Sequence, residues 1–323
     1  MSDVRRVLIA AAMAISLLPV PALAAAPPTT VRIGVLMPLG SHSEAGLREG
    51  LSELGYIEGQ NLKIESRPYE QSTDALQSAA ADLVRLRVDV IVAVGTQAAR
   101  AALSATSTIP VVFLSGDPIA SGLAASLARP GANATGVSTQ TTELMAKRLE
   151  LLQQVVPRLR RATLLVNPDN PLHAAILSET QKVARTLRIQ IVPLSARNAD
   201  ELDAALRGIQ RNAGDALIVS SDTFFRVSKD KIGDAVRKAK LPALVPTKDY
   251  QWDGVLMSYG PSLSWGARRA AIYVDKIVKG ARPADLPVEQ VSKFELVIDL
   301  RAAHQLGIKV PQEILLRADE VIR

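Results

Sequence analysis

The chain has 323 residues, a length that favours two domains, and 48% of them are hydrophobic, which is enough to fill a large core. It contains no cysteine, so disulfides, thiolate metal sites and cysteine nucleophiles are excluded. The net charge of +6 comes from lysines and arginines spread along the chain, without the basic stripe and stacking aromatics typical of nucleic-acid binding, so we expect no nucleic-acid partner.

The first 26 residues have the layout of a secretory signal peptide. Arg5 and Arg6 precede an apolar run at 7–18, and a proline-containing break at 19–21 precedes the small residues 22–26. The apolar run is shorter than the roughly 18–20 residues that span a membrane, which favours a signal peptide over a membrane anchor. Because no cysteine is present to carry a lipid, we expect a soluble periplasmic protein without a lipid anchor.

Short apolar runs rich in Val, Ile and Leu alternate with helical patterns along the rest of the chain. The first block predicts strands at 31–37, 61–66, 88–94, 111–114 and 136–138, with helices at 44–54, at 72–84 and from Gln97. The second predicts a helix at 141–156 and then strands at 162–166, 189–194, 216–219 and 243–245 separated by helices. The tail adds a strand at 255–258, a helix at 263–278, a strand at 294–298 and a helix ending at Leu306. The pattern predicts the α/β class, with two Rossmann-like lobes built on parallel sheets.

The C-terminal segment decides how the two lobes are joined. If the lobes share it, lobe 1 comprises 31–140 plus 256–285, and lobe 2 comprises 141–255 plus 286–323. The chain then crosses near 138–142, 253–259 and 283–288, which makes a hinge beside a cleft. A contiguous arrangement of two domains fits the same pattern nearly as well.

Small polar residues follow several predicted strands, and ligands of open parallel sheets bind at the carboxyl ends of strands. Thr96 begins a helix, where its hydroxyl and the nearby amides suit a carboxylate, whereas Asp117 and Asp222 suit a ligand ammonium or hydroxyl group. The alternative is that these residues and the 167–170 turn only cap helices or turns. The candidate ligand-binding residues at strand ends are Gly40, His42, Thr96, Gln97, Ser115, Gly116, Asp117, Asn167, Asp169, Asn170, Ser221 and Asp222.

Several motifs of enzymes are missing from the sequence. It has no G-x-G-x-x-G after the first strand, no P-loop, no G-x-S-x-G and no H-E-x-x-H. Its three histidines lie in separate segments, and His173 is expected on an exposed helix surface. We therefore predict a binding protein with no catalytic residues, no metal site and no cofactor. A carboxylate-based enzyme using Asp117, Asp169 or Asp222 is the less favoured alternative.

Five further segments of the chain are distinctive when taken together. They are Gly46–Gly50 leading into Leu54-Gly55-Tyr56-Ile57-Glu58-Gly59-Gln60-Asn61, Val94-Gly95-Thr96, Asp117-Pro118-Ile119-Ala120-Ser121-Gly122-Leu123, Gly131-Ala132-Asn133-Ala134-Thr135-Gly136 and Leu315-Leu316-Arg317-Ala318-Asp319-Glu320-Val321-Ile322. In these segments the chain resembles one known family, the substrate-binding proteins of ABC transporters, in the group associated with tryptophan or tyrosine-like ligands. The resemblance runs from about Val31 to the C-terminus.

The resemblance implies a periplasmic binding protein of type I topology that closes on its ligand about a hinge. It adds Tyr259 to the candidate ligand-binding residues. It also implies a small-molecule ligand, with an ABC permease and its ATPase as partners, and we expect a monomer. The mixture of donors and carboxylates at the strand ends suits an amino-acid-like zwitterion, a polar aromatic acid or a nucleoside-like compound. A protein that presents its ligand to a membrane receptor instead of a permease is the alternative function.

Overall fold

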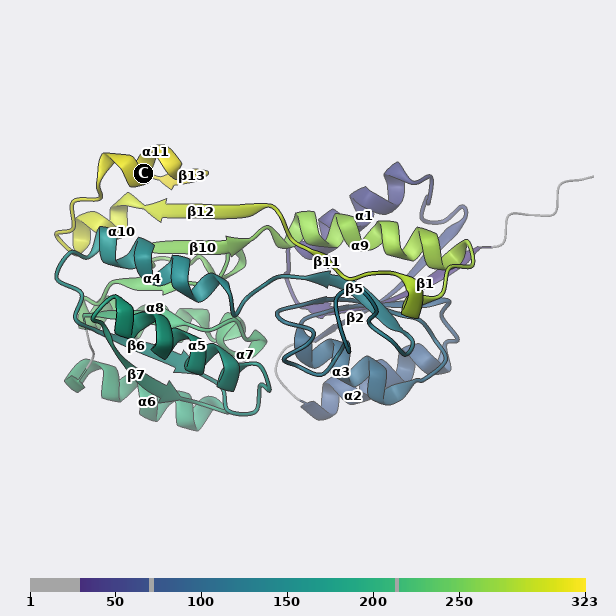
Figure 1. Cartoon of the computed structure of the whole chain (residues 1–323), viewed down its shortest axis with the longest axis horizontal. Helices are drawn as coiled ribbons and strands as arrows, with labels where there is room; N and C mark the ends of the chain where they lie inside the picture. The colour runs from purple at the N-terminus through teal and green to yellow at the C-terminus, as the bar shows by residue number, and fades with distance from the viewer. Residues whose placement is uncertain (1–29, 70–72, 213–214) are drawn as a thin grey trace, which may run out of the picture.

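A computed structural model describes residues 30–69, 73–212 and 215–323, and it contains two α/β lobes side by side (Figure 1). The predicted signal peptide at 1–26 lies outside the described residues. In the first lobe β11-β5-β4-β3-β1-β2 form one sheet in which every pair of neighbouring strands is parallel. The elements of this lobe are β1 (Val31–Pro38), α1 (Ser43–Glu53), β2 (Leu62–Tyr69), α2 (Thr73–Arg85), β3 (Val90–Val94), α3 (Thr96–Ala105), β4 (Val111–Ser115), β5 (Ala134–Ser138), α9 (Leu263–Val278), η2 (Pro283–Asp285) and β11 (Glu289–Gln290).

The second lobe contains the sheet β13-β12-β10-β9-β8-β6-β7, which is parallel except for the antiparallel pair β10 and β12. Its elements in the middle of the chain are α4 (Leu144–Val155), β6 (Arg161–Val166), α5 (His173–Thr186), β7 (Gln190–Ser195), α6 (Ala199–Asn212), β8 (Ala216–Val219), α7 (Thr223–Val227), α8 (Lys229–Ala239), β9 (Ala243–Val245), η1 (Lys248–Tyr250) and β10 (Met257–Pro261). Its C-terminal elements are β12 (Phe294–Asp299), α10 (Leu300–Gln305), α11 (Gln312–Arg317) and β13 (Glu320–Ile322). The predicted class of two mainly parallel α/β lobes is confirmed.

The chain crosses between the lobes after β5, after β10 and after β11. This division differs from the predicted boundaries at two places. Residues 257–261 were expected in lobe 1, but β10 pairs with β9 and β12 of the second sheet. Residues 289–290 were expected in lobe 2, but β11 pairs with β5 of the first. Hydrophobic periodicity identifies a strand without its partner, and β11 is too short to leave a pattern.

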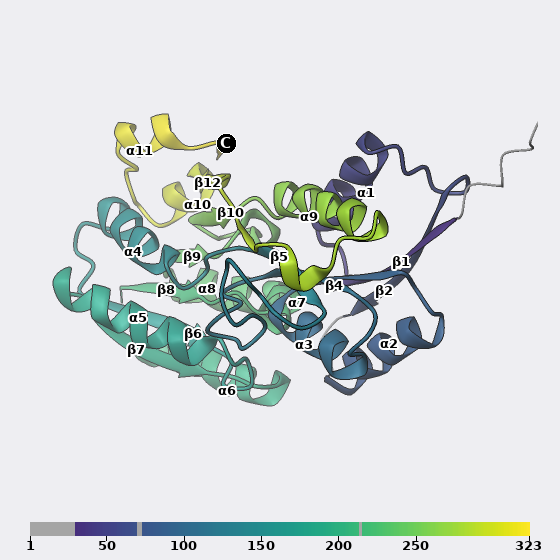
Figure 2. The same cartoon turned by 45° about the vertical axis from the view of Figure 1, so that its right-hand side comes forward.

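Helices cover both faces of each sheet, so alternate residues of the central strands enter opposite cores. In the first lobe α1 and α9 lie on one side of the sheet, and α2 and α3 lie on the other (Figure 2). In β3, Val90, Val92 and Val94 pack in the core with α1 and α9, whereas Ile91 and Ala93 pack in the core with α2 and α3. This explains why the strand is a continuous apolar run.

Close packing of α9 on α1 joins the tail of the chain to the first lobe. A Cβ atom at Gly46 would lie 2.1 Å from the backbone oxygen of Ser264, so only glycine allows this approach. The contiguous arrangement of domains is therefore not the one that forms.

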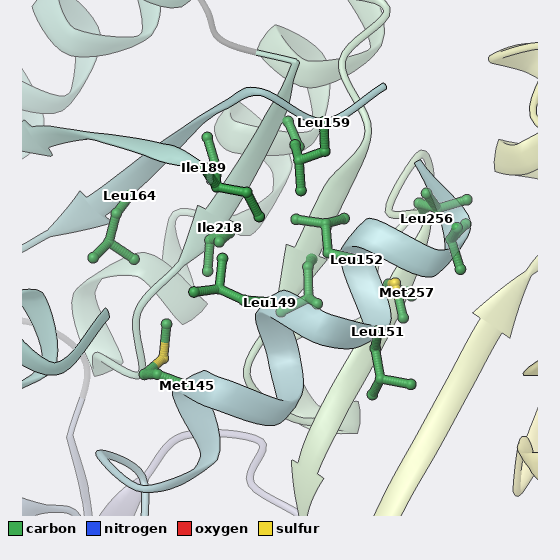
Figure 3. Close-up of a cluster of buried hydrophobic side chains, with 14 of the residues drawn as sticks. Met145, Leu149, Leu151, Leu152, Leu159, Leu164, Ile189, Ile218, Leu256 and Met257 are labelled. Atoms are coloured by element: carbon green, nitrogen blue, oxygen red, sulfur yellow. The ribbon is translucent and has the colours of Figure 1, made fainter. Parts of the chain in front are cut away.

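In the second lobe one core lies between the sheet and α4 with α5, where Met145, Leu149 and Leu152 of α4 meet Leu164 and Ile218 of the strands (Figure 3). These side chains are at most 1% exposed. The other core of this lobe packs α6 and α8 against the opposite face. Each lobe thus has its own hydrophobic cores, and the helices packed on both faces of its sheet fix the positions of the strand ends.

Candidate ligand-binding site between the lobes

Two adjoining cavities lie between the lobes, where the carboxyl ends of β1, β3, β4, β6 and β8 meet. The smaller cavity, of about 80 Å³, is lined by Gly95, Thr96 and Gly116 of the first lobe and by Asn170 and Ser221 of the second, among others. The larger cavity has a volume of about 350 Å³. Both are lined by Gln97, Asp222 and Thr223, so the two cavities share a wall.

The first lobe contributes neutral hydroxyl groups and a helix start. Thr96 is the first residue of α3, and its Oγ1 lies 2.9 Å from Oγ of Ser115 at the end of β4. Gly95 is the N-cap of α3 and has no side chain to accept a hydrogen bond from the first turn. Because the first N–H groups of a helix have no partner within it, this helix start suits an anionic group of a ligand.

The second lobe contributes a buried carboxylate that holds three donors. Oδ1 of Asp222 accepts a hydrogen bond from the N–H of Phe224 at 2.9 Å and so caps α7. Oδ2 accepts hydrogen bonds from the side-chain amides of Asn170 at 2.9 Å and Asn167 at 3.3 Å. Asp222 therefore both caps α7 and lines the two cavities.

His173 connects the two strand-end loops of the second lobe. Its Nδ1 accepts a hydrogen bond from the N–H of Asn167 at 2.7 Å, so its Nε2 donates to the carbonyl oxygen of Ser221 at 3.1 Å. The ring stacks on Phe225 with 6.3 Å between centroids. Burial lowers the pKa of His173, although the nearby charge of Asp222 opposes this shift. The expectation of an exposed His173 is wrong, because helix periodicity did not reveal that α5 begins underneath the site; the side chain is 2% exposed.

Direct contacts between the lobes surround the cavities. Nη2 of Arg226 donates to the carbonyl oxygen of Leu39 at 2.6 Å. The carboxylate of Asp249 accepts hydrogen bonds from the hydroxyl of Ser41 at 3.3 Å and the N–H of His42 at 3.1 Å, and its Oδ1 lies 2.9 Å from Nδ1 of His42. The lobes are thus in contact on the side of the loop that follows β1.

A close approach of the lobes occurs at Gly116. A Cβ atom there would lie 2.3 Å from Cδ2 of Leu172 in the second lobe, and 3.1 Å from Oγ1 of Thr141. Gly116 therefore allows the lobes to approach as closely as they do.

Most of the predicted strand-end residues lie at the cavities. Those that line one or both are Thr96, Gln97, Gly116, Asn167, Asp169, Asn170, Ser221 and Asp222. Ser115 lies directly behind Thr96 and supports its hydroxyl. Gly40 and His42 line neither cavity; His42 instead contacts Asp249 across the lobes.

Two further predicted residues lie elsewhere. Oδ1 of Asp117 accepts hydrogen bonds from the N–H groups of Ile119 and Ala120, so this carboxylate caps the turn after β4. The ring of Tyr259 stacks on Phe294 of the adjacent strand, and its carbonyl oxygen accepts a hydrogen bond from Nε of the buried Arg148. Neither residue lines a cavity. Asp117 follows the alternative interpretation as a cap, and Tyr259 lies within β10, where its ring packs on the sheet.

Several cavity residues were not predicted from the sequence. They are Tyr69, Thr139, Thr141, Thr223, Arg226, Asp249 and Tyr250, among others. Arg226 follows Asp222 by one helical turn, a spacing that places both on one face of α7 and is the signal that could have identified it. Burial raises the pKa of the phenols of Tyr69 and Tyr250, so both stay protonated near neutral pH.

Within the described ranges, no cluster of three or more His, Cys, Asp or Glu side chains is arranged to hold a metal ion. In the same part of the chain, none of the helices combines the length and apolar character needed to cross a bilayer.

Two mainly parallel lobes with polar strand ends facing one another define the fold of periplasmic binding proteins. The model of the family described as "ABC transporter substrate binding protein" matches residues 34–322, and the chain belongs to this family. The resemblance inferred from the sequence is thereby confirmed. The function of the family is to bind a transporter substrate, and it is not a family of enzymes.

Individual relatives agree with this assignment. A tyrosine-binding protein of Clostridioides difficile is 24% identical over 258 residues, which cover 80% of this chain and 74% of the relative. A conserved domain protein of Vibrio cholerae is similar in structure with a TM-score of 0.86 at 27% identity, covering 91% of this chain and 100% of that one. An ABC domain from Streptococcus pneumonia in complex with L-Trp has a TM-score of 0.83 at 25% identity, with the same coverage.

Proposed function

We propose that this protein is exported to the periplasm, captures one small polar molecule in the cleft between its lobes, and delivers it to an ABC permease driven by an ATPase. The ligand class that we propose is an amino acid or a related aromatic acid. The expectations of export, of a monomeric state and of these partner subunits all belong to this proposal.

One observation carries the proposal: both lobes supply polar groups to the same enclosed space. Thr96 and the start of α3 reach it from the first lobe, and Asn170 and Asp222 reach it from the second. A ligand that contacts both sets has more contacts in the closed arrangement than in an open one. Its binding therefore stabilises the closed form, by as much as its affinities for the two forms differ.

The chemistry of the two sides suits a molecule with two unlike polar ends. The helix start at Gly95 and Thr96 provides N–H and O–H donors for a carboxylate. Asp222 provides a buried carboxylate for an ammonium group. The similarity to a tyrosine-binding protein and to a domain with bound L-Trp supports an α-amino acid as the ligand.

The proposal is tested by a thermal-shift screen of the protein lacking residues 1–26 against amino acids, aromatic acids, nucleosides and sugars. A ligand present at a hundred times its dissociation constant adds about 2.7 kcal/mol of stability, which a melting curve detects easily. We expect a hit among the amino acids, with calorimetry giving one molecule per chain and chromatography recovering it unchanged. The absence of any hit, or a compound that is consumed over time, would contradict the proposal.

A further inference from the structure

Arg226 occupies an unusual position at the smaller cavity. It lies on α7 of the second lobe and is 9% exposed. Its Nη2 donates to the carbonyl oxygen of Leu39 in the first lobe, so the side chain reaches across the cleft. Its Nε is also buried, yet within the described part of the chain this N–H has no hydrogen-bond partner. A buried donor without an acceptor costs free energy, and its presence at a cavity points to a ligand atom that accepts its hydrogen bond.

The charges around the guanidinium point to the same conclusion. Arg226 forms no ion pair with any residue in the described ranges, although Asp222 and Asp249 also line this cavity. Both carboxylates are occupied by other donors: Asp222 by two amides and the start of α7, and Asp249 by Ser41 and His42. A buried cation without an anion at contact distance is costly, so an anion in the cavity would be stabilised there.

We infer that Arg226 is the residue that recognises a carboxylate of the ligand, through its Nε, while its Nη2 holds the first lobe at Leu39. This inference rests on the proposed function and names the ligand class of the same site: a molecule with a free carboxylate, rather than its amide, a sugar or a nucleoside. The start of α3 lines the same cavity, and one carboxylate has enough acceptor sites to bind both Nε of Arg226 and the donors at the start of α3.

This assignment joins recognition to closure in a single side chain. A carboxylate bound at Nε fixes the guanidinium in the orientation in which Nη2 reaches Leu39 of the opposite lobe. Charge balance then favours a zwitterion over a simple acid, because the cavity already contains two carboxylates for one guanidinium. The ammonium group of an α-amino acid offsets the charge of its own carboxylate, so a zwitterion leaves the net charge of the cavity unchanged, whereas a simple acid makes it more negative.

The test compares acids with their amides in the wild-type protein and in Arg226→Gln. The probes are L-tryptophan, L-tyrosine and L-phenylalanine with the corresponding carboxamides, measured by calorimetry, alongside the sugars and nucleosides of the screen. Arg185→Gln is the matched control, because it removes the same charge from an exposed position on α5 of the same lobe. Melting temperatures of all variants establish that each is folded.

We expect the wild-type protein to bind an acid roughly 10- to 150-fold more tightly than its amide, the range for hydrogen bonds to charged groups. Arg226→Gln should lose more affinity for the acid than for the amide, so that the preference for the acid falls to less than about threefold, while Arg185→Gln changes neither affinity. Equal losses for acid and amide would show that Arg226 only links the lobes, and would overturn the inference. A best ligand without a carboxylate would overturn it too, yet leave the proposed function intact, whereas no ligand of any class would overturn both.

Discussion

The two sides of the cleft differ in chemistry although both are built from parallel strand ends. The first lobe presents hydroxyl groups, a glycine and a helix start, as at Thr96, Ser115 and Gly116. The second lobe presents charges and amides, as at Asn170 and Asp222. The hydroxyl groups of Thr96 and Ser115 satisfy one another within the first lobe, whereas the buried carboxylate of the second lobe requires a network of donors around it. The carboxylate that lines both cavities thus belongs to the second lobe, whereas the helix start belongs to the first.

The largest effect is expected from Asp222→Ala. It leaves two buried amides and the N–H of Phe224 without their acceptor, and each buried donor left unpaired costs about 1–3 kcal/mol. Even with partial rearrangement we expect a loss of about 2–4 kcal/mol in the free energy of unfolding. Ligand affinity should fall by about 1–3 kcal/mol. Urea unfolding and calorimetry measure the two effects.

Asp117→Ala is the matched control for that substitution, since it removes the same side chain from a strand end of the first lobe that lines neither cavity. Loss of its turn cap should cost about 1 kcal/mol of stability and leave ligand affinity unchanged within error. If the two aspartates affect affinity equally, the distinction drawn between them is incorrect.

An intermediate effect is expected at Gly116, where the first lobe depends on having no side chain. In Gly116→Ala the new methyl group would meet Leu172 in the closed arrangement, which we expect to weaken ligand affinity by about 1–2 kcal/mol. The unfolding midpoint should change less than the affinity does, because the clash exists only when the lobes are closed.

The control for Gly116 is Gly208→Ala, on α6, where an added Cβ atom would meet nothing within 4 Å. Combining Gly116→Ala with Leu172→Ala should restore part of the lost affinity by removing the opposing methyl groups. Affinity that is unchanged in Gly116→Ala would mean that the ligand does not require this approach of the lobes.

The smallest expected effect is a pH dependence of stability that comes from His173 of the second lobe. Burial lowers the pKa of His173 below its usual value of 6.5 in the folded protein, so the unfolded chain takes up a proton first as the pH falls. The stability linked to His173 is therefore complete above pH 6.5, and it decreases as the pH falls below that value, by at most about 1.4 kcal/mol per pH unit.

Protonation would also turn Nδ1 into a donor facing the N–H of Asn167. The loop after β6 would then lose its hydrogen bond to His173, which also contacts the loop after β8 that contains Asp222. Urea midpoints at pH 7.5 and 5.5, compared between the wild-type protein and His173→Gln, measure this contribution. A pH dependence that is identical in both proteins would remove His173 from this role.

Most of the fold follows from the sequence because each central strand, such as 111–114 or 216–219, is a continuous apolar run between helical patterns. The cleft follows in part because parallel strands end at one edge, which brings Thr96, Asn170 and Asp222 together without any knowledge of the tertiary structure. The same rule also predicts Asp117 at the cleft, although its carboxylate caps its own turn. The local sequence does not distinguish a strand-end carboxylate of this kind from one that lines a cavity.

Other parts of the site depend on contacts that no local pattern contains. Arg226 lies inside a short helix and Asp249 inside a 3₁₀ turn, and both contact first-lobe residues that are distant in the sequence. The role of His173 depends on the stacking of α5 against Phe225, which connects distant segments. The predicted crossing near 138–142 agrees with the structure, whereas the other two differ, because β10 and β11 are assigned to a lobe by their pairing with β12 and β5 rather than by their own residues.

The most direct test of the account is hydrogen exchange, measured by mass spectrometry, with and without the ligand that the screen identifies. The account predicts slower exchange on ligand addition at the start of α3, residues 96–99, and also at residues 220–226 of the second lobe, with little change at α11, none of whose residues lines either cavity. Slower exchange in only one of the two lobes, or at neither of these segments, would contradict the claim that the ligand is held between them.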